Sequence, residues 1–552
     1  MSLFFGCVGG QLGRHNSDEY RNGMVVSANG IASQVGVDIL KKGGNAVDAA
    51  VAVQFALAVV YPNAGNIGGG GFMVYRSATG EANTLDFREK AAGGATRDMY
   101  LDAAGNPIVE KSLYGQLAAG VPGSVAGMVE AHQKYGKLKW EDLVKPAVKL
   151  AGEGFKITAR QAKELNGLQK RLKALNPLGT ALLKDSQWAE GDVLVQQELA
   201  NTLKLIAEKG RKGFYEGPVA DSIVAEMQRG GGIMTKQDLQ NYQAVWRKPI
   251  VGSYRGYEIV TMPPPSSGGI ALVQLLKSVE PYPLAKWGFN ADSTVQLMVE
   301  AERRVYADRA SYLGDPDFYP VPQKKLMEDA YIRQRMGTFN WQQAGSSASI
   351  GAGEIPPAEH EETTHFSIVD KEGNAVSITT TLNGSYGAAV VVKGAGFLLN
   401  NEMDDFSVKP GAPNMYGLVG GEANAIAPNK RMLSSMTPAI LSKDGQLFMV
   451  VGTPGGSTII TSVFQTILNV VDFNKSMQAA VSAKKFHHQW LPDQVDVEEN
   501  AIDSLTMIKL KAKGYKLVPR GPIGRVDAIL RTKWGFYQGG ADPRGDDKAI
   551  GW

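Results

Sequence analysis

Cysteine is almost absent from this chain, which has Cys7 as its single cysteine in 552 residues. An intramolecular disulfide therefore cannot form, and a zinc site built from several thiolates is excluded. Histidine is also scarce, with six residues. The chain carries no G-x-S-x-G motif that would present a catalytic serine, so a Ser/His/Asp triad is not indicated.

Neither sign of charge is in excess. The 58 lysine and arginine residues and the 55 aspartate and glutamate residues leave a net charge of +3. Such a balance gives no support to a nucleic-acid or anionic-membrane partner. Long apolar runs are lacking too: the longest covers residues 49–61 and is interrupted by Gln54. A membrane span needs about 20 residues, so the sequence predicts no transmembrane segment and a buried core helix at this position.

Glycine, in contrast, is abundant, with 65 residues against an average usage of about 7%. There is no G-x-y period, which excludes a collagen-like chain. Hydrophobic residues make up 43% of the chain and charged residues 20%, as in ordinary globular proteins. We therefore expect a large folded core with many tight turns and close backbone contacts.

The amino terminus has two interpretations. Residues 1–7 contain a short apolar stretch that ends in Gly6 and Cys7 but lack the basic region and length of a complete secretory signal. They are either a short flexible end or the remainder of a truncated lipoprotein signal that ends at Cys7. We expect residues 1–21 to be flexible.

Hydrophobic periodicity predicts an α/β chain. Helices are expected at 30–42, 48–60, 457–470 and from 476, with mostly helical structure over 113–343; strands are expected at 72–76, 83–87, around 249–261, and in hairpins over 363–381 and 439–451. Helices flanking a double sheet give a layered fold. Residues 344–362, rich in Gly, Ser, Ala, Glu and Pro, read as a mobile linker.

Three motifs are rejected as functional sites. The glycine run 65–71 lacks the GK[ST] of a phosphate loop and precedes a strand, so close backbone packing is the better explanation. His360 begins an apparent HExxH, but position 364 is threonine. His487 and His488 point to opposite faces of a strand and favour a packed, hydrogen-bonded pair over a metal site.

What remains is the linker that ends at Thr363 and Thr364, at the start of a strand. A threonine hydroxyl needs a base to act as a nucleophile. Cleavage before Thr363 would supply one, because the new α-amino group has a pKa of about 7.7–8. Threonines are common in strands, so this pattern alone is weak.

The sequence resembles the γ-glutamyltranspeptidases, or glutathione hydrolases, of bacterial type, from about residue 22 to the carboxyl terminus. The blocks that carry the resemblance are residues 43–50, 65–72, 86–89, 262–269, 312–316, 363–365, 399–406, 430–438 and 452–456. The resemblance implies the αββα sandwich of N-terminal-nucleophile hydrolases. It also implies a proenzyme that cleaves itself between Glu362 and Thr363 into a large chain, 1–362, and a small chain, 363–552, which form one intertwined heterodimer.

The resemblance further implies the roles of individual residues. Thr363 would be the nucleophile and Thr381 its supporting threonine, and Gly455 and Gly456 would form the oxyanion hole. Arg88, assisted by Ser434 and Ser435, would bind the substrate α-carboxylate, while Asn383, Glu402 and Asp405 would bind its α-ammonium; Tyr416 would cover the site from a lid over 410–421. Position 402 is glutamate in some relatives and glutamine in others, and its effect on hydrolysis against transfer stays open.

The implied activity is attack by Thr363 on the γ-glutamyl amide bond of glutathione or a related compound. The γ-glutamyl group would then pass to water or to an amino-acid or dipeptide acceptor, with no metal or organic cofactor. Relatives are mostly periplasmic or secreted. A glutaryl or cephalosporin acylase on the same scaffold is the alternative, and an unprocessed binding homologue is a further one. Both are disfavoured: an acylase would not need Glu402 and Asp405 together, and an inactive homologue would be expected to lose Thr363 or the oxyanion glycines.

Overall fold

The computed structural model describes residues 19–352, 364–409 and 421–552. Two seven-stranded sheets form its centre, with strand orders β19-β2-β10-β11-β3-β4-β7 (the first sheet) and β1-β18-β17-β13-β12-β9-β8 (the second sheet). The first comprises Lys548–Gly551, Met24–Ser27, Thr364–Val369, Ala375–Thr381, Gly70–Arg76, Ala82–Asp86 and Val245–Arg247. The second comprises Glu19–Tyr20, Tyr537–Gly540, Asp527–Arg531, Gln446–Gly452, Ala439–Lys443, Tyr257–Thr261 and Ile250–Tyr254.

Helices surround the two sheets. The first ten are α1 Gly30–Lys41, α2 Ala46–Val60, α3 Val109–Leu113, α4 Ser124–Tyr135, α5 Trp140–Glu153, α6 Ala159–Leu175, α7 Gln197–Lys209, α8 Lys212–Tyr215, α9 Gly217–Gly230 and α10 Lys236–Asn241. The others are α11 Gly268–Val279, α12 Leu284–Trp287, α13 Asp292–Tyr312, α14 Gln323–Leu326, α15 Asp329–Met336, α16 Thr458–Val471, α17 Met477–Ser482 and α18 Ser504–Ala512. Short strands complete the structure: β5 Phe155–Lys156, β6 Val193–Leu194, β14 Phe486–His487, β15 Val495–Glu498 and β16 Leu517–Arg520.

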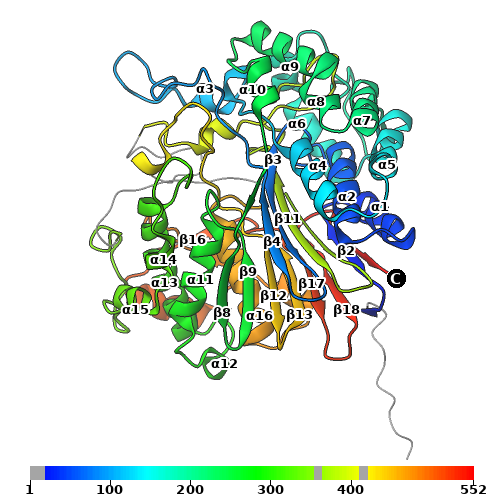
Figure 1. Ribbon diagram of the computed structural model, residues 1–552. Coiled ribbons are helices and arrows are strands. Elements are labelled where there is room, and N and C mark those ends of the chain that lie inside the picture. Colours follow the sequence, from blue (N-terminus) through cyan, green and yellow to red (C-terminus); the bar gives the residue numbers. More distant parts are fainter. Residues whose placement is uncertain (1–18, 353–363, 410–420) are drawn as a thin grey trace, which may run out of the picture.

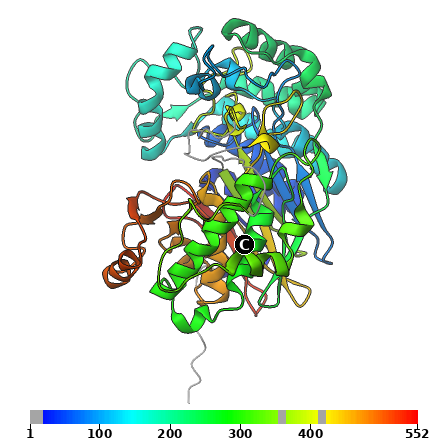
Figure 2. The same cartoon turned by 90° about the vertical axis from the view of Figure 1, so that its left-hand side faces the viewer.

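Three hydrophobic layers hold these elements together. One core lies between the first sheet and helices that include α1, α2, α5 and α7. A second lies between the second sheet and helices that include α11, α13 and α16. A third fills the space between the sheets, where Val74 and Val369 of the first sheet pack with Ile440 and Val450 of the second. The two groups of helices lie on opposite sides of the sheets (Figures 1 and 2). The layers are therefore α, β, β and α, as predicted.

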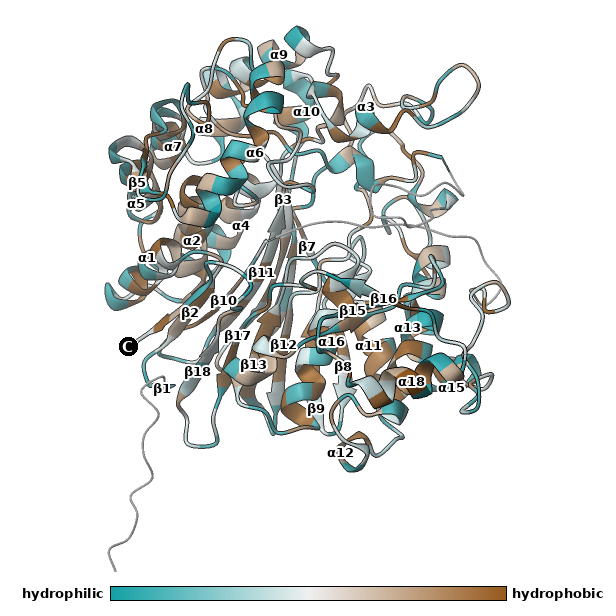
Figure 3. Cartoon of the chain, turned by 180° about the vertical axis from the view of Figure 1, so that it is seen from behind, coloured by the Kyte–Doolittle hydropathy of each residue, from teal (hydrophilic) through white to brown (hydrophobic). Residues whose placement is uncertain are grey.

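Each central strand is buried on both faces, because a sheet covers one face and helices cover the other. All six residues of β10 and all seven of β11 are buried. Figure 3 shows hydrophobic residues along the strands, and hydrophilic residues on outer helices such as α6. The alternation seen in the sequence thus separates two buried faces rather than a buried face from solvent.

The apolar run at 49–61 forms most of α2, and every residue of this helix is buried. Asn45 and Asp48 form a capping box at its start, which satisfies backbone N–H groups that the first helical turn leaves without partners. The predicted core helix is confirmed. Of the helices in the described ranges, none has both the length and the hydropathy of a membrane span.

Most predicted elements are confirmed within two residues, including the hairpins β10–β11 and β12–β13. Two expectations, the flexible residues 1–21 and the mobile linker 344–362, are wrong in part. Residues 19–20, expected to be flexible, form β1 and pair with β18 at the edge of the second sheet. The start of the expected mobile linker is anchored: the Ala344 N–H donates to Lys513, and the buried Ser347 N–H donates to Asp493. The remainder of that linker, 353–362, lies outside the described residues.

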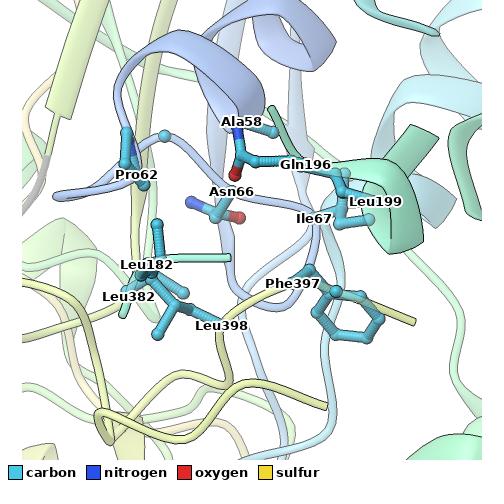
Figure 4. Close-up of a pocket in the computed structure, with 12 residues that line it drawn as sticks. Ala58, Pro62, Asn66, Ile67, Leu182, Gln196, Leu199, Leu382, Phe397 and Leu398 are labelled. Atoms are coloured by element: carbon cyan, nitrogen blue, oxygen red, sulfur yellow. The ribbon is translucent and has the colours of Figure 1, made fainter. Parts of the chain in front are cut away.

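The glycine run 65–71 packs against backbone, as predicted. A Cβ atom at Gly68 would lie 2.1 Å from the Leu398 carbonyl oxygen, and one at Gly69 would lie 1.9 Å from the Thr381 carbonyl oxygen. Only glycine permits such an approach. The cavity beside this run, where Asn66 lies among apolar side chains (Figure 4), has a volume of about 20 Å³. It has room for one water molecule and no substrate.

Candidate active site

The expected nucleophile Thr363, the expected cleavage partner Glu362 and the expected lid residue Tyr416 lie outside the described residues. The next residue, Thr364, begins β10 and pairs with Thr380 in β11. Thr381 ends β11 and pairs with Gly70 at the start of β3. The start of β10, the end of β11 and the start of β3 therefore lie together at one end of the first sheet.

The turn after β11 joins Thr381 to Asn383. The Thr381 hydroxyl accepts a hydrogen bond of 2.7 Å from the Asn383 N–H. Asn383 has a φ of 69°, in the left-handed region where asparagine is among the better-tolerated residues. Its side-chain amide donates to the Asn401 carbonyl at 2.9 Å, which links this turn to the segment that carries Glu402.

Arg88 is completely buried and lies among three carboxylates. It follows β4, where its N–H donates to the Asp86 carboxylate. Its guanidinium donates to Glu402 Oε1 and to Asp405 Oδ2, both at 2.5 Å, and contacts Glu89 Oε2 at 3.4 Å. The structure thus unites Arg88, Glu402 and Asp405 across more than 300 residues of sequence. It also adds Glu89 to the predicted set.

Burial and charge shift the pKa values of this cluster. Burial would lower the pKa of Arg88, but Glu402, Glu89 and Asp405 raise it on balance. Burial and the neighbouring Glu402 raise the pKa of Glu89 well above its usual value. Burial likewise raises the pKa of Asp405 well above its usual value, against the opposing effect of Arg88. One cation faces three carboxylates, so the cluster favours an additional positive charge.

A 3-10 helix, Glu402–Asp405, presents the two predicted carboxylates. Asn400 fixes its start: the Asn400 side-chain oxygen accepts from the Glu402 N–H at 3.0 Å, and its amide donates to Gly68 and Gly120. The glycine run and the 3-10 helix are therefore held together. The approach that Gly68 permits brings the acidic segment to the end of the central strands.

Several buried carboxylate and amide oxygen atoms in this region, Glu89 Oε1 among them, accept no hydrogen bond from a described N–H or hydroxyl group. Three of them belong to the predicted ammonium-binding residues: Asn383 Oδ1, Glu402 Oε2 and Asp405 Oδ1. Buried acceptors without donors are costly and rare in folded proteins. An alkylammonium group has three N–H donors and one positive charge, so this set matches its requirements in number and in charge.

Ser434 and Ser435 are buried and directly follow Met432 and Leu433, whose carbonyl oxygens accept hydrogen bonds from the Arg88 guanidinium. The Ser434 carbonyl accepts from both the N–H and the hydroxyl of Ser267, at 2.7 Å each. The Ser435 hydroxyl accepts from Arg309 at 2.8 Å. The conspicuous block 262–269 therefore holds the serine pair in place.

Gly455 and Gly456 lie between β13 and α16. No described acceptor takes a hydrogen bond from either backbone N–H. Their carbonyl oxygens accept from the N–H groups of Thr458 and Ile459 at the start of α16, so both glycines sit at the positive end of this helix. Positive φ angles of 139° and 59° require glycine at these two positions. The pair has the chemistry of an oxyanion hole.

His487 and His488 are packed within the core. His487 bonds Thr461 and Gln489, and His488 bonds the Gln494 carbonyl, which confirms the predicted hydrogen-bonded pair. His365, directly after Thr364, is buried and bonds Thr379 and Ser367. Within the ranges that the structure describes, no group of three or more His, Cys, Asp or Glu side chains could hold a metal ion.

Sequence reasoning missed several residues that build the site, namely Glu89, Ser267, Arg309 and Asn400. Glu89, Ser267 and Asn400 belong to blocks 86–89, 262–269 and 399–406, which the resemblance had already marked without giving them roles. Arg309 lies in α13, between marked blocks, and no sequence signal pointed to it. Its contact with Ser435 spans 126 residues.

Comparisons with known proteins agree on a family. A sequence profile described as Gamma-glutamyltranspeptidase matches residues 32–552. The glutathione hydrolase proenzyme of Escherichia coli (strain K12) is 48% identical over 536 residues, which cover 96% of this chain and 92% of that protein.

Two solved structures are also similar. Helicobacter pylori γ-glutamyltranspeptidase matches with a TM-score of 0.59 and 45% identity, over 62% of this chain and 97% of that chain. A cephalosporin acylase from Bacillus halodurans matches with a TM-score of 0.87 and 29% identity, over 100% of this chain and 99% of that chain. These likenesses confirm the predicted N-terminal-nucleophile hydrolase fold.

Proposed function

This chain belongs to the γ-glutamyltranspeptidase family and is a self-processing γ-glutamyl transferase and hydrolase, and we propose that it acts on glutathione and related γ-glutamyl amides. The observation that carries the proposal is the set of three buried acceptors on Asn383, Glu402 and Asp405. A γ-glutamyl group ends in an α-ammonium, which supplies the three donors and the charge that these oxygens need.

The placement of individual charges in the site supports the same donor. Arg88 faces Glu89, Glu402 and Asp405, all fully buried. The head of a γ-glutamyl group is a zwitterion, so it adds one positive and one negative charge and leaves the balance unchanged. Its ammonium would take over interactions of Glu402 and Asp405, which frees part of the Arg88 guanidinium for the α-carboxylate. Ser434 and Ser435 would complete the carboxylate site.

The proposed reaction begins at Thr363. Its hydroxyl oxygen attacks the γ-carbonyl carbon, and its own α-amino group takes the hydroxyl proton. The N–H groups of Gly455 and Gly456 donate to the resulting oxyanion. The C–N bond then breaks, the proton passes to the leaving amine, and a γ-glutamyl ester of Thr363 remains. Water or an acceptor amine attacks this ester and restores the threonine.

The same hydroxyl would first perform the self-cleavage. Attack on the Glu362 carbonyl shifts that acyl group from nitrogen to oxygen, and water then hydrolyses the ester. The products would be chains 1–362 and 363–552. Strands of the two chains lie side by side in the first sheet: β10 and β11 of the small chain lie between β2 and β3 of the large chain. Separation would expose the cores of both chains, so we propose that they stay together as one heterodimer. We also propose that the enzyme works outside the cytoplasm, as the family resemblance implies.

The likeness to a cephalosporin acylase makes glutaryl-type amides the second candidate substrates. A glutaryl group carries the carboxylate and lacks the ammonium. It would leave the acceptors of Asn383, Glu402 and Asp405 without donors and add a further negative charge to the cluster. This cost disfavours the acylase function.

Two measurements test the proposal. A denaturing gel of the purified protein should show two chains, and the protein should release 4-nitroaniline from γ-glutamyl-4-nitroanilide faster when glycylglycine is present. Faster release from the glutaryl anilide than from the γ-glutamyl anilide would favour the acylase instead. A single band without activity would support a binding homologue.

A further inference from the structure

The direction of a backbone N–H group is tied to the carbonyl of the residue before it. A trans peptide bond is planar, so its C=O and N–H point in opposite directions. The Gly455 N–H therefore shares a plane with the Pro454 carbonyl, and the Gly456 N–H shares one with the Gly455 carbonyl. Neither of these two peptide bonds is cis. Groups that hold the two carbonyls therefore also direct the two proposed oxyanion donors.

Two threonine hydroxyls hold these carbonyls. Thr453 Oγ1 donates to the Pro454 carbonyl at 2.7 Å. Thr458 Oγ1 donates to the Gly455 carbonyl, also at 2.7 Å, and the Thr458 N–H adds a second bond of 3.1 Å. Each threonine thus acts on one peptide plane, and the N–H in that plane points away from the hydroxyl.

Both threonines are buried, Thr453 with 0% and Thr458 with 1% of its surface exposed. Bulk water therefore cannot readily replace either hydroxyl at its carbonyl. The Thr453 hydroxyl also accepts from the Arg525 N–H at 2.7 Å. A hydroxyl has one proton to donate, so this bond leaves that proton for the Pro454 carbonyl.

Gly455 and Thr458 fit each other closely. A Cβ atom at position 455 would lie 2.6 Å from Thr458 Oγ1, so any side chain there would displace the hydroxyl from the carbonyl that it holds. Glycine at this position therefore does more than permit a positive φ angle. It admits the group that fixes the next N–H.

The first turn of α16, which carries Thr458, is itself anchored from the core. The Tyr306 hydroxyl, from α13, donates to the Ser457 carbonyl. The Thr461 hydroxyl donates to the Thr458 carbonyl at 3.1 Å and bonds His487 Nδ1 at 2.8 Å. The Thr458 hydroxyl is therefore held on a fixed base, and the buried histidine contributes to that base.

We propose that Thr453 and Thr458 are positioning residues that direct the N–H groups of Gly455 and Gly456 at the oxyanion. The inference rests on the proposed function. Oxyanion donors act when they lie about 2.7–3.1 Å from the charged oxygen. A peptide plane without its hydroxyl loses part of this contact in the transition state, whereas binding of the donor at Arg88 is unchanged. Loss of a hydroxyl should therefore lower kcat and leave KM unaltered.

The test replaces each hydroxyl with a methyl group, in Thr458→Val and Thr453→Val. The assay is release of 4-nitroaniline from γ-glutamyl-4-nitroanilide per processed enzyme. In both variants kcat should fall about 5- to 30-fold, with KM within about two-fold of the parent. Removal of a whole donor costs roughly 100- to 1,000-fold, and here the N–H remains while its direction is freed. Thr458→Ser and Thr453→Ser keep the hydroxyl and should stay within about three-fold of the parent.

A boronic acid analogue of the donor gives a readout that a merely structural role would not move. The Thr363 oxygen adds to boron, its α-amino group takes the hydroxyl proton, and the tetrahedral adduct places a negative oxygen at the oxyanion position. Thr458→Val should weaken this inhibitor by about the factor by which kcat falls. The inhibition constant of glutamate, which forms no adduct, should change by less than about two-fold.

Thr466→Val is the matched control. Thr466 is buried in the same helix, more than two turns further along, and its hydroxyl donates to the Ser462 carbonyl at 2.7 Å. Its kcat should stay within about two-fold of the parent.

Three results would each overturn the inference: parent kcat values in Thr458→Val and Thr453→Val, an equal loss of kcat in Thr466→Val, or equal weakening of the boronic acid and glutamate. In each case hydrolysis by the parent would still support the proposed function. Absence of hydrolysis in the parent would refute the proposed function and this inference with it.

Discussion

Asp405→Asn should shift specificity from γ-glutamyl toward glutaryl compounds. Asp405 is fully buried, and its two oxygens have different surroundings: Oδ2 accepts from Arg88 at 2.5 Å, while Oδ1 accepts from no described group. In the proposed complex Oδ1 faces the donor ammonium. Aspartate can accept on both sides, whereas asparagine has one acceptor oxygen and a donor NH₂. The variant must therefore direct NH₂ toward either Arg88 or the ammonium.

The magnitude follows from the hydrogen bond that is lost. A hydrogen bond to a charged group contributes roughly 1.5–3 kcal/mol, so kcat/KM for a γ-glutamyl donor should fall about 10- to 150-fold. A glutaryl donor has no ammonium and loses nothing by the change. Because the cluster also has one negative charge fewer, its kcat/KM should hold or rise. Both effects move the ratio of the two specificities in the same direction.

The assay measures kcat/KM for paired γ-glutamyl and glutaryl 4-nitroanilides on the parent and the variant. Processing should survive, because Thr363 and the oxyanion glycines are unchanged. Asp404→Asn is a suitable control, since Asp404 lies in the same 3-10 helix but accepts from Ser112, and it should leave the ratio near the parent value. An unchanged ratio in correctly processed Asp405→Asn would remove Asp405 from the ammonium site and weaken the case against an acylase.

Three further predictions follow from the same structure. Thr363→Ala should block both maturation and activity, because one hydroxyl serves both; mass spectrometry should show that the parent's small chain begins at Thr363, and a start at Thr364 would refute the assignment. Arg88→Lys should process normally but lose about 10- to 150-fold in kcat/KM for the donor, because one ammonium cannot replace a guanidinium that bonds two carboxylates; a change under about two-fold would exclude Arg88 as the carboxylate site. Burial lowers the pKa of His487 to about 3, so between pH 6.5 and 3 the unfolded chain binds a proton that the folded protein excludes. The contribution of neutral His487 to the free energy of unfolding is therefore fully present above about pH 6.5 and is lost progressively as the pH falls below it. From pH 7 to pH 5 the parent should therefore lose about 2 kcal/mol of unfolding free energy that His487→Gln does not lose; urea unfolding at both pH values measures this, and a constant gap between the two proteins would contradict it.

The sequence by itself determined the local structure and the family. A continuous apolar run located α2. Alternation of apolar and polar residues located the hairpins β10–β11 and β12–β13, because successive side chains of a strand point to opposite faces. Glycine run 65–71 was correctly read as a close packing site, since its lack of Cβ atoms is itself the relevant property. The resemblance identified the family because many short blocks occur in one order.

Only the tertiary structure decided what those residues contact. Arg88 and Glu402 are 314 positions apart in the sequence. No local pattern indicates that Arg88, expected to bind the substrate carboxylate, forms ion pairs with Glu402 and Asp405, which are expected to bind the ammonium. Burial of β10 and β11 on both faces, anchoring of residues 344–352, and the contact of Arg309 with Ser435 likewise depend on which layers pack together. Hydrogen bonds, burial and charge compensation are long-range properties, so they exist only once the layers have assembled.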